Sequence, residues 1–134
     1  MWSDRSIRVA DVVSMPGVCS VATYAAMKKF SADFLRGLGL CDVNRLGKPA
    51  IKIPYFDADG HNAATRFRTA LAKSPGGEDD RFRWVQGAKP MLYGLWRIRE
   101  LNASNHVTLV EGESDCHASW SHGISALGIP GAGN

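Results

Sequence analysis

Residues 107–115, which read VTLVEGESD, decide the fold class of this chain. An apolar run ends in an acid and a glycine, and acidic residues then open a helical pattern that we expect to span 114–122. Residues 106–110 are expected to form the strand before it, and 124–127, after Gly123, the strand behind it. The order strand, helix, strand predicts a βαβ unit with parallel strands.

The acid at the end of this strand is the first candidate for chemistry. Open α/β sheets place active sites at the carboxyl ends of their strands, and Glu111 follows four apolar residues and precedes a glycine. A carboxylate there could hold Mg²⁺ or move a proton, so we favour a functional role for Glu111. Asp115 falls in the first helical turn, where function and compensation of the helix dipole are equally good interpretations.

The upstream half predicts two helices and an antiparallel hairpin. Residues 20–29 and 31–38 have helical patterns, and the second helix lacks the basic face of a DNA-reading helix. Residues 49–55 alternate as a strand, 57–60 supply a turn, and the second strand follows over 61–71. Arg66 and Arg68 must share one face of that strand. A third strand is expected over 81–85, and the glycine-rich connection 73–80 is expected to be mobile.

The predicted fold class is therefore α+β: N-terminal helices, an antiparallel hairpin or sheet, and a partial α/β unit of the βαβ type. The 134 residues suit one compact domain or two small subdomains. Apolar residues make up 45% and charged residues 22%, with neither a bilayer-length apolar run nor a signal peptide. We expect a cytoplasmic protein without a membrane partner.

Charge and cysteine content exclude few classes of function. The net charge is +3, and basic residues concentrate between Arg66 and Arg99. These residues could simply form a solvated surface, which composition alone favours, or they could bind phosphates. The three cysteines have no zinc-ligand spacing, so no zinc site is expected. His117 and His122 are expected at the surface or its boundary, and the tryptophans in the core.

The motif of 110–115 resembles the opening of the TOPRIM domain shared by DnaG-type primases, topoisomerases and related nucleases. Upstream, the segment Lys89–Trp96, which reads KPMLYGLW, resembles the basal subdomain that precedes TOPRIM in DnaG-type primases. The sequence thus resembles a DnaG-type primase core of phage or mobile-element type, or a primase-helicase, over residues 20–134. The implied division is an extension over 1–19, the basal subdomain over 20–100 and the first part of TOPRIM over 101–134.

This resemblance implies RNA primer synthesis on single-stranded DNA from ribonucleotides, with a replicative helicase domain as a further partner. Glu111 would be the TOPRIM glutamate, with Asp115 as a second catalytic residue and Mg²⁺ or Mn²⁺ as the cofactor. Arg66, Arg68 and Lys89 would bind template or nucleotide phosphates.

Two departures from the family pattern restrict the expected activity. The Asp-x-Asp pair that completes the TOPRIM metal site does not occur before Asn134, so Glu111 is part of an incomplete site. Asp57 and Asp59 do not replace it, because they stand in a predicted turn. The zinc ribbon of many primases is also missing. We therefore expect a fragment of a nucleotidyltransferase that is inactive alone.

Two other functions remain open. A module that binds single-stranded nucleic acid without catalysis would show salt-dependent, metal-independent binding. A TOPRIM nuclease would share Glu111 but cut phosphodiesters, and the primase-like segment Lys89–Trp96 disfavours it.

Overall fold

A computed structural model describes residues 15, 17–73, 75, 81–100 and 105–131. The mobile connection predicted over 73–80 and the extension predicted over 1–19 lie largely outside these residues. The elements in chain order are α2 (Val21–Lys28), α3 (Ala32–Gly37), β1 (Cys41–Arg45), β2 (Lys48–Phe56), β3 (Asn62–Arg68), β4 (Phe82–Trp84), a 3₁₀ helix (Leu95–Arg97), β5 (Thr108–Glu111), α5 (Gly112–Ser121) and β6 (Ala126–Ile129).

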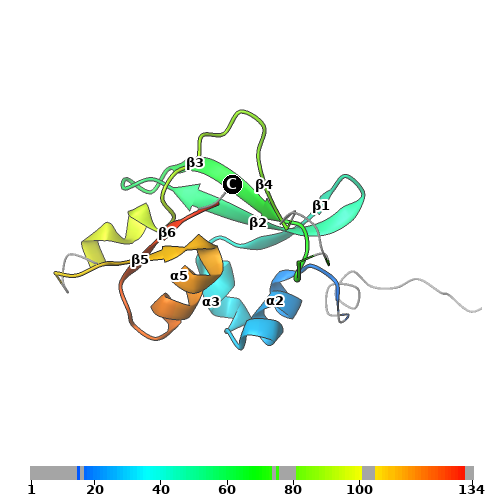
Figure 1. The fold of residues 1–134 in the computed structure, drawn as a ribbon, viewed down its shortest axis with the longest axis horizontal. Helices are drawn as coiled ribbons and strands as arrows, with labels where there is room; N and C mark the ends of the chain where they lie inside the picture. Colours follow the sequence, from blue (N-terminus) through cyan, green and yellow to red (C-terminus); the bar gives the residue numbers. More distant parts are fainter. Residues whose placement is uncertain (1–14, 16, 74, 76–80, 101–104, 132–134) are drawn as a thin grey trace, which may run out of the picture.

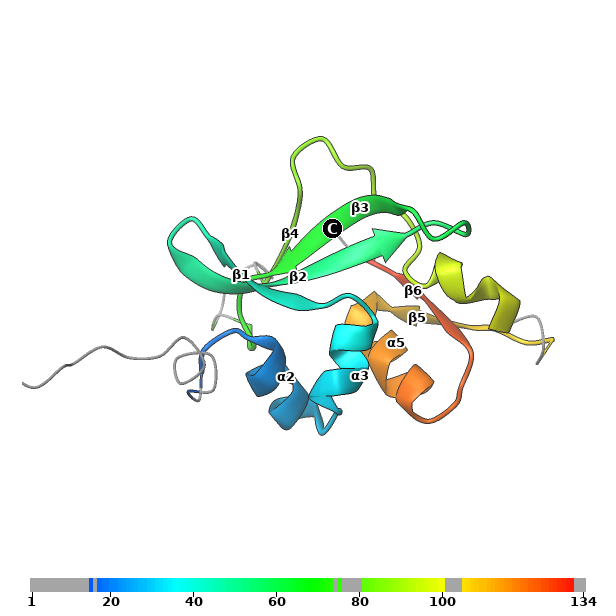
Figure 2. The same ribbon diagram turned by 180° about the vertical axis from the view of Figure 1, so that it is seen from behind.

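The strands form two separate sheets. Strands β1 to β4 make an antiparallel meander in sequence order, whereas β5 and β6 run parallel to each other. Helix α5 connects β5 to β6, which confirms the βαβ unit. The α+β class predicted from the sequence is also confirmed. Figure 1 shows α2, α3 and α5 on one side of the four-stranded sheet, and the reverse view in Figure 2 agrees.

The two N-terminal helices begin where the sequence indicates. The Ser20 side chain accepts a hydrogen bond from the Thr23 amide at 3.2 Å and Thr23 reciprocates, which makes a capping box. The Ser31 side chain caps α3 by accepting a hydrogen bond from the Phe34 amide. Among the described residues, no helix is both long and apolar enough to cross a membrane.

Strand β1 was not predicted. Its sequence, CDVNR, has only two apolar residues, Cys41 and Val43, which is too short an alternation to indicate a strand. The strand lies at the edge of the sheet, paired with β2 alone in the described residues. The turn between them contains Leu46 and Gly47, both with positive φ, as two-residue hairpin turns require. Strand β6 also begins two residues later than expected, because Ile124 remains outside the sheet and is 51% exposed.

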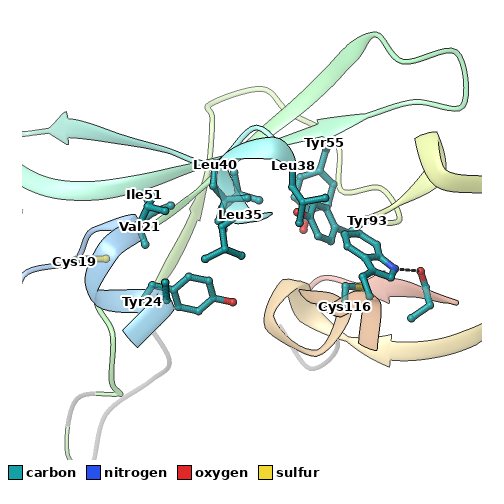
Figure 3. Close-up of a cluster of buried hydrophobic side chains, with 14 of the residues drawn as sticks. Cys19, Val21, Tyr24, Leu35, Leu38, Leu40, Ile51, Tyr55, Tyr93 and Cys116 are labelled. Atoms are coloured by element: carbon teal, nitrogen blue, oxygen red, sulfur yellow. Dashed lines mark hydrogen bonds between the residues drawn. The ribbon is translucent and has the colours of Figure 1, made fainter. Parts of the chain in front are cut away.

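The core fills the space between the four-stranded sheet and the helices. Figure 3 shows Tyr24 of α2, Leu35 of α3, Tyr55 of β2 and Cys116 of α5 directed into this layer. The burial of the Cys116 thiol raises its pKa to about 12, which keeps it protonated and apolar in character.

His117 is fully buried in this core, so the expectation of a surface or boundary position is wrong. The Tyr24 hydroxyl lies 2.8 Å from its Nδ1, and the Tyr93 hydroxyl lies 2.8 Å from its Nε2. Burial lowers the pKa of His117 to about 3, so the ring is neutral at pH 7. His122 is exposed, as expected.

Candidate functional site: a cleft between acidic and basic walls

A cleft of about 440 Å³ opens where the start of α5 faces the four-stranded sheet. One wall carries the carboxylates of β5 and α5, and the other carries cations from β3, its flanking loops and α2. Its charged lining residues are Glu111, Glu113, Asp115, Lys28, Arg66, Arg68, Lys73 and Arg81. Carboxylates and cations in one cleft are suited to a phosphate that carries a divalent cation.

The acidic wall follows from the geometry of the βαβ unit. Glu111 ends β5 and occupies the N-cap position of α5, and Asp115 lies in the first turn of that helix. Gly112 has a φ of +73°, a value that favours glycine, and it allows the chain to leave the strand and enter the helix at once. Both carboxylates are exposed at the cleft. The structure therefore brings together the two predicted catalytic residues.

Glu113 lies between them in sequence and also lines the cleft, but its side chain is buried. It is only 2% exposed, and its Oε1 accepts a hydrogen bond from the Tyr55 hydroxyl and another from Arg66 Nη1 at 3.1 Å. This buried ion pair joins α5 to strands β2 and β3. Within the described residues, Glu113 Oε2 and Arg66 Nε have no hydrogen-bond partner. Burial raises the pKa of Tyr55, and the negative charge of Glu113 raises it further, so Tyr55 remains a hydrogen-bond donor.

The sequence predicted no role for Glu113, although the spacing of the apolar residues that follow it indicates a buried position. Cys116, His117 and Trp120 are three, four and seven positions further along α5, and all are buried. Residues at these spacings share one helix face. Glu113 is therefore on the buried face, while Glu111 and Asp115 remain on the exposed side.

Arg66 and Arg68 do point the same way, as the strand period requires, but toward the interior. They are 4% and 3% exposed. Arg68 donates from Nε to the Ala70 carbonyl at 3.1 Å and from Nη2 to the Leu71 carbonyl at 2.8 Å. Its guanidinium also stands 4.8 Å from the centre of the Tyr24 ring. Burial lowers the pKa of Arg68 from its ordinary value.

The exposed cations of the cleft are Lys28 and Lys73, and Arg81 is half-buried. The two buried arginines lie behind them and add positive potential to this wall. Lys89, the third predicted phosphate contact, is exposed but does not line the cleft. The structure therefore places Arg66 and Arg68 together at the site and Lys89 apart from it.

Glu111 and Asp115 fit a magnesium ion that is shared with a phosphate. Mg²⁺ is usually bound by one or two carboxylates together with phosphate and water oxygens, rather than by a complete protein cage. Asp57, Asp59 and His61 also place possible ligand atoms within 4.8 Å of one another. However, Asp57 Oδ1 accepts hydrogen bonds from the amides of Asp59 and His61, both at 2.9 Å, which is a turn-forming role.

Comparison with known proteins identifies the fold. No protein-family model matches the chain, and no curated protein matches it. The DnaG primase catalytic domain solved with single-stranded DNA aligns with a TM-score of 0.58 and 18% identity, over 84% of this chain and 48% of that one. The RNA polymerase domain of Mycobacterium tuberculosis primase DnaG aligns with a TM-score of 0.60 and 14% identity, over 81% of this chain and 49% of that one.

The chain thus has a primase-like fold and spans about half the length of these two domains. This result confirms the fold implied by the sequence resemblance.

Proposed function

We propose that the chain is part of a primase catalytic core and that its cleft binds the phosphates of single-stranded DNA or of a ribonucleotide. The observation that carries the proposal is the pairing of exposed Glu111 and Asp115 with a cationic wall across one cleft. The shared fold supports it, and one matched domain was solved with single-stranded DNA. RNA primer synthesis, the TOPRIM assignment, a phage or mobile-element origin, a cytoplasmic location and a helicase partner belong to this proposal.

In this proposal the residues of the cleft have separate tasks. Lys28 and Lys73, both exposed, would contact phosphate oxygens directly. Arg66 and Arg68 would strengthen the positive potential from behind, as their burial suggests. Lys89 would contact the strand outside the cleft.

Glu111 and Asp115 would hold Mg²⁺ or Mn²⁺, which neutralises phosphate charge during nucleotidyl transfer. Glu113 does not contact the cleft ligand in this scheme. Its bonds to Arg66 and Tyr55 fix the start of α5 against the sheet and thereby orient the two exposed carboxylates.

The test is titration of the chain with a fluorescent ribonucleoside triphosphate, with and without Mg²⁺, measured by anisotropy. We expect Mg²⁺ to strengthen binding, and we expect Glu111→Gln/Asp115→Asn to abolish that gain. Both substitutions are at exposed positions and preserve side-chain shape. Equal binding with and without Mg²⁺ would contradict the metal role of these two residues.

Two further outcomes identify the alternative functions. Salt-dependent binding of single-stranded DNA without any metal-dependent nucleotide binding would identify a non-catalytic nucleic-acid module. Nicking of plasmid DNA that requires Mg²⁺ and Glu111 would identify a nuclease.

A further inference from the structure

The face of the four-stranded sheet that points away from the helices carries an unusual set of charges. Six of the strand residues in β1 to β4 are basic, and only Asp42 is acidic. Arg66 and Arg68 point inward. The other four cations, with Phe67, define what we call the outer face: Arg45, Lys48, Lys52, Arg83 and Phe67.

The strand register places these side chains together. Lys52 pairs with Phe67, and Phe67 pairs with Arg83, so the two cations flank the ring on neighbouring strands. Paired residues lie on the same side of a sheet. Arg45 pairs with Lys48 further along, and its guanidinium carbon stands 5.1 Å from the centre of the Phe67 ring. A hollow of about 390 Å³ is lined by three of these cations, Arg45, Lys48 and Arg83.

No carboxylate neutralises this cluster within the described part of the chain. The one acidic strand residue, Asp42, belongs to the opposite face, where its Oδ1 accepts a hydrogen bond from the Val21 amide at 2.7 Å. None of the four cations forms an ion pair within 4.0 Å among the residues described. In Figures 1 and 2 the helices α2, α3 and α5 all lie on the other side of the sheet.

Within the described residues, four cations without an ion-pair partner lie on the same face as the Phe67 ring, and this arrangement is suited to a flexible polyanion with planar bases. Neighbouring strands are separated by about 4.8 Å, so the Cα atoms of Lys52 and Arg83 lie roughly 10 Å apart. Their long side chains can reach successive phosphates of an extended strand. The guanidinium of Arg45, 5.1 Å from the centre of the Phe67 ring, is a planar group of the kind on which a base can stack. A rigid duplex keeps its bases stacked and could use only the charges.

We propose that the outer face binds a single-stranded polynucleotide, with phosphates on Lys48, Lys52 and Arg83 and a base on Arg45. This surface is separate from the cleft, and its role does not depend on the proposed catalytic function. DNA and RNA strands share the phosphate and base chemistry that the face recognises.

The test measures the salt dependence of binding to a 20-residue oligothymidylate and to an oligouridylate of equal length. Lys52→Gln/Arg83→Gln removes two exposed or half-buried cations and leaves the cleft intact. Each lost phosphate contact on a single strand lowers the slope of log K against log salt by about 0.7. We expect a decrease of about 1.4 and, at 0.1 M salt, about 25-fold weaker binding.

Arg36→Gln/Arg99→Gln is the matched control, because it removes the same charge from two exposed positions outside both surfaces. It should leave the salt slope within error of the unmodified chain. Equal slopes for the outer-face variant and the control would overturn the proposal. Equally tight binding of a duplex of the same length would overturn it as well.

The metal-dependent nucleotide binding of the cleft gives an independent result in the same preparations. If metal-dependent nucleotide binding is observed but the outer-face substitutions leave the salt slope unchanged, the outer-face proposal fails alone. If the unmodified chain shows no metal-dependent nucleotide binding but the salt slope still responds to these substitutions, the cleft proposal fails alone.

Discussion

Glu113→Ala should destabilise the fold far more than the neighbouring substitutions Glu111→Ala and Asp115→Ala. Glu113 and Arg66 are 2% and 4% exposed, and the removal of one carboxylate would leave a buried guanidinium and the Tyr55 hydroxyl without their acceptor. The loss of one partner from a buried ion pair costs about 3–5 kcal/mol. For a chain of this size, that free energy corresponds to a decrease in Tm of about 10–20 °C.

The assay is urea unfolding followed by both tryptophan fluorescence and circular dichroism, so that coincident transitions justify a two-state treatment. Trp84 reports on this region, because its ring centre lies 4.8 Å from that of Tyr55. The matched control removes all three polar groups at once, as Tyr55→Phe/Arg66→Met/Glu113→Leu. It should recover most of the lost stability, since apolar replacements of a buried pair are often neutral.

Either of two results would refute this reasoning. A cost below about 1 kcal/mol for Glu113→Ala would mean that water reaches the pair and solvates the arginine. A triple variant as unstable as the sum of its three single variants would mean that these groups do not act as one network.

Three further outcomes follow from the same structure. Burial holds the pKa of His117 at about 3, below its ordinary 6.5, so the unfolded chain takes up the proton first as the pH falls. Urea unfolding should therefore give a free energy of unfolding that is roughly 2 kcal/mol lower at pH 5.0 than at pH 7.5. An equal decrease in His117→Gln would contradict this cause. Gly128→Ala should cost about 1–3 kcal/mol in thermal melts, because its Cβ would lie 2.8 Å from the Gly112 carbonyl oxygen, whereas Gly37→Ala, with open space around it, should cost little. Leu109 is 58% exposed on β5, which pairs only with β6 in the described residues, so we expect this edge to promote self-association. Sedimentation experiments should show less association for Leu109→Lys than for the unmodified chain, without a lower Tm, and equal association would exclude this edge as its cause.

The parts of the fold that the sequence predicted are those with local causes. Ser20 and Ser31 start their helices through their own side chains, and the alternation of β2 requires no distant partner to be recognised. The βαβ unit was predictable because apolar runs flank an acid, a glycine and a helical pattern.

The parts that it missed depend on distant residues. Strand β1 exists because β2 offers it a full row of hydrogen bonds, and its own polar sequence does not indicate a strand. The alternation in β3 showed that Arg66 and Arg68 share a face, but not that this face is covered by helices. The burial of His117 likewise depends on Tyr24 and Tyr93, which come from two distant segments.

The division of the basic strand residues between the two faces of the sheet restricts how a nucleic acid can be bound. A phosphate that took Arg66 as its direct ligand would remove the guanidinium from Glu113 and leave a buried carboxylate without its counter-charge. Such a contact would therefore weaken the packing of α5 against the sheet when the ligand binds. Ligands of the cleft are therefore expected to contact its exposed lysines, and the buried arginines to act through their field. Within the described residues, the cations of the outer face form no ion pair, so they can bind phosphates without breaking a buried pair.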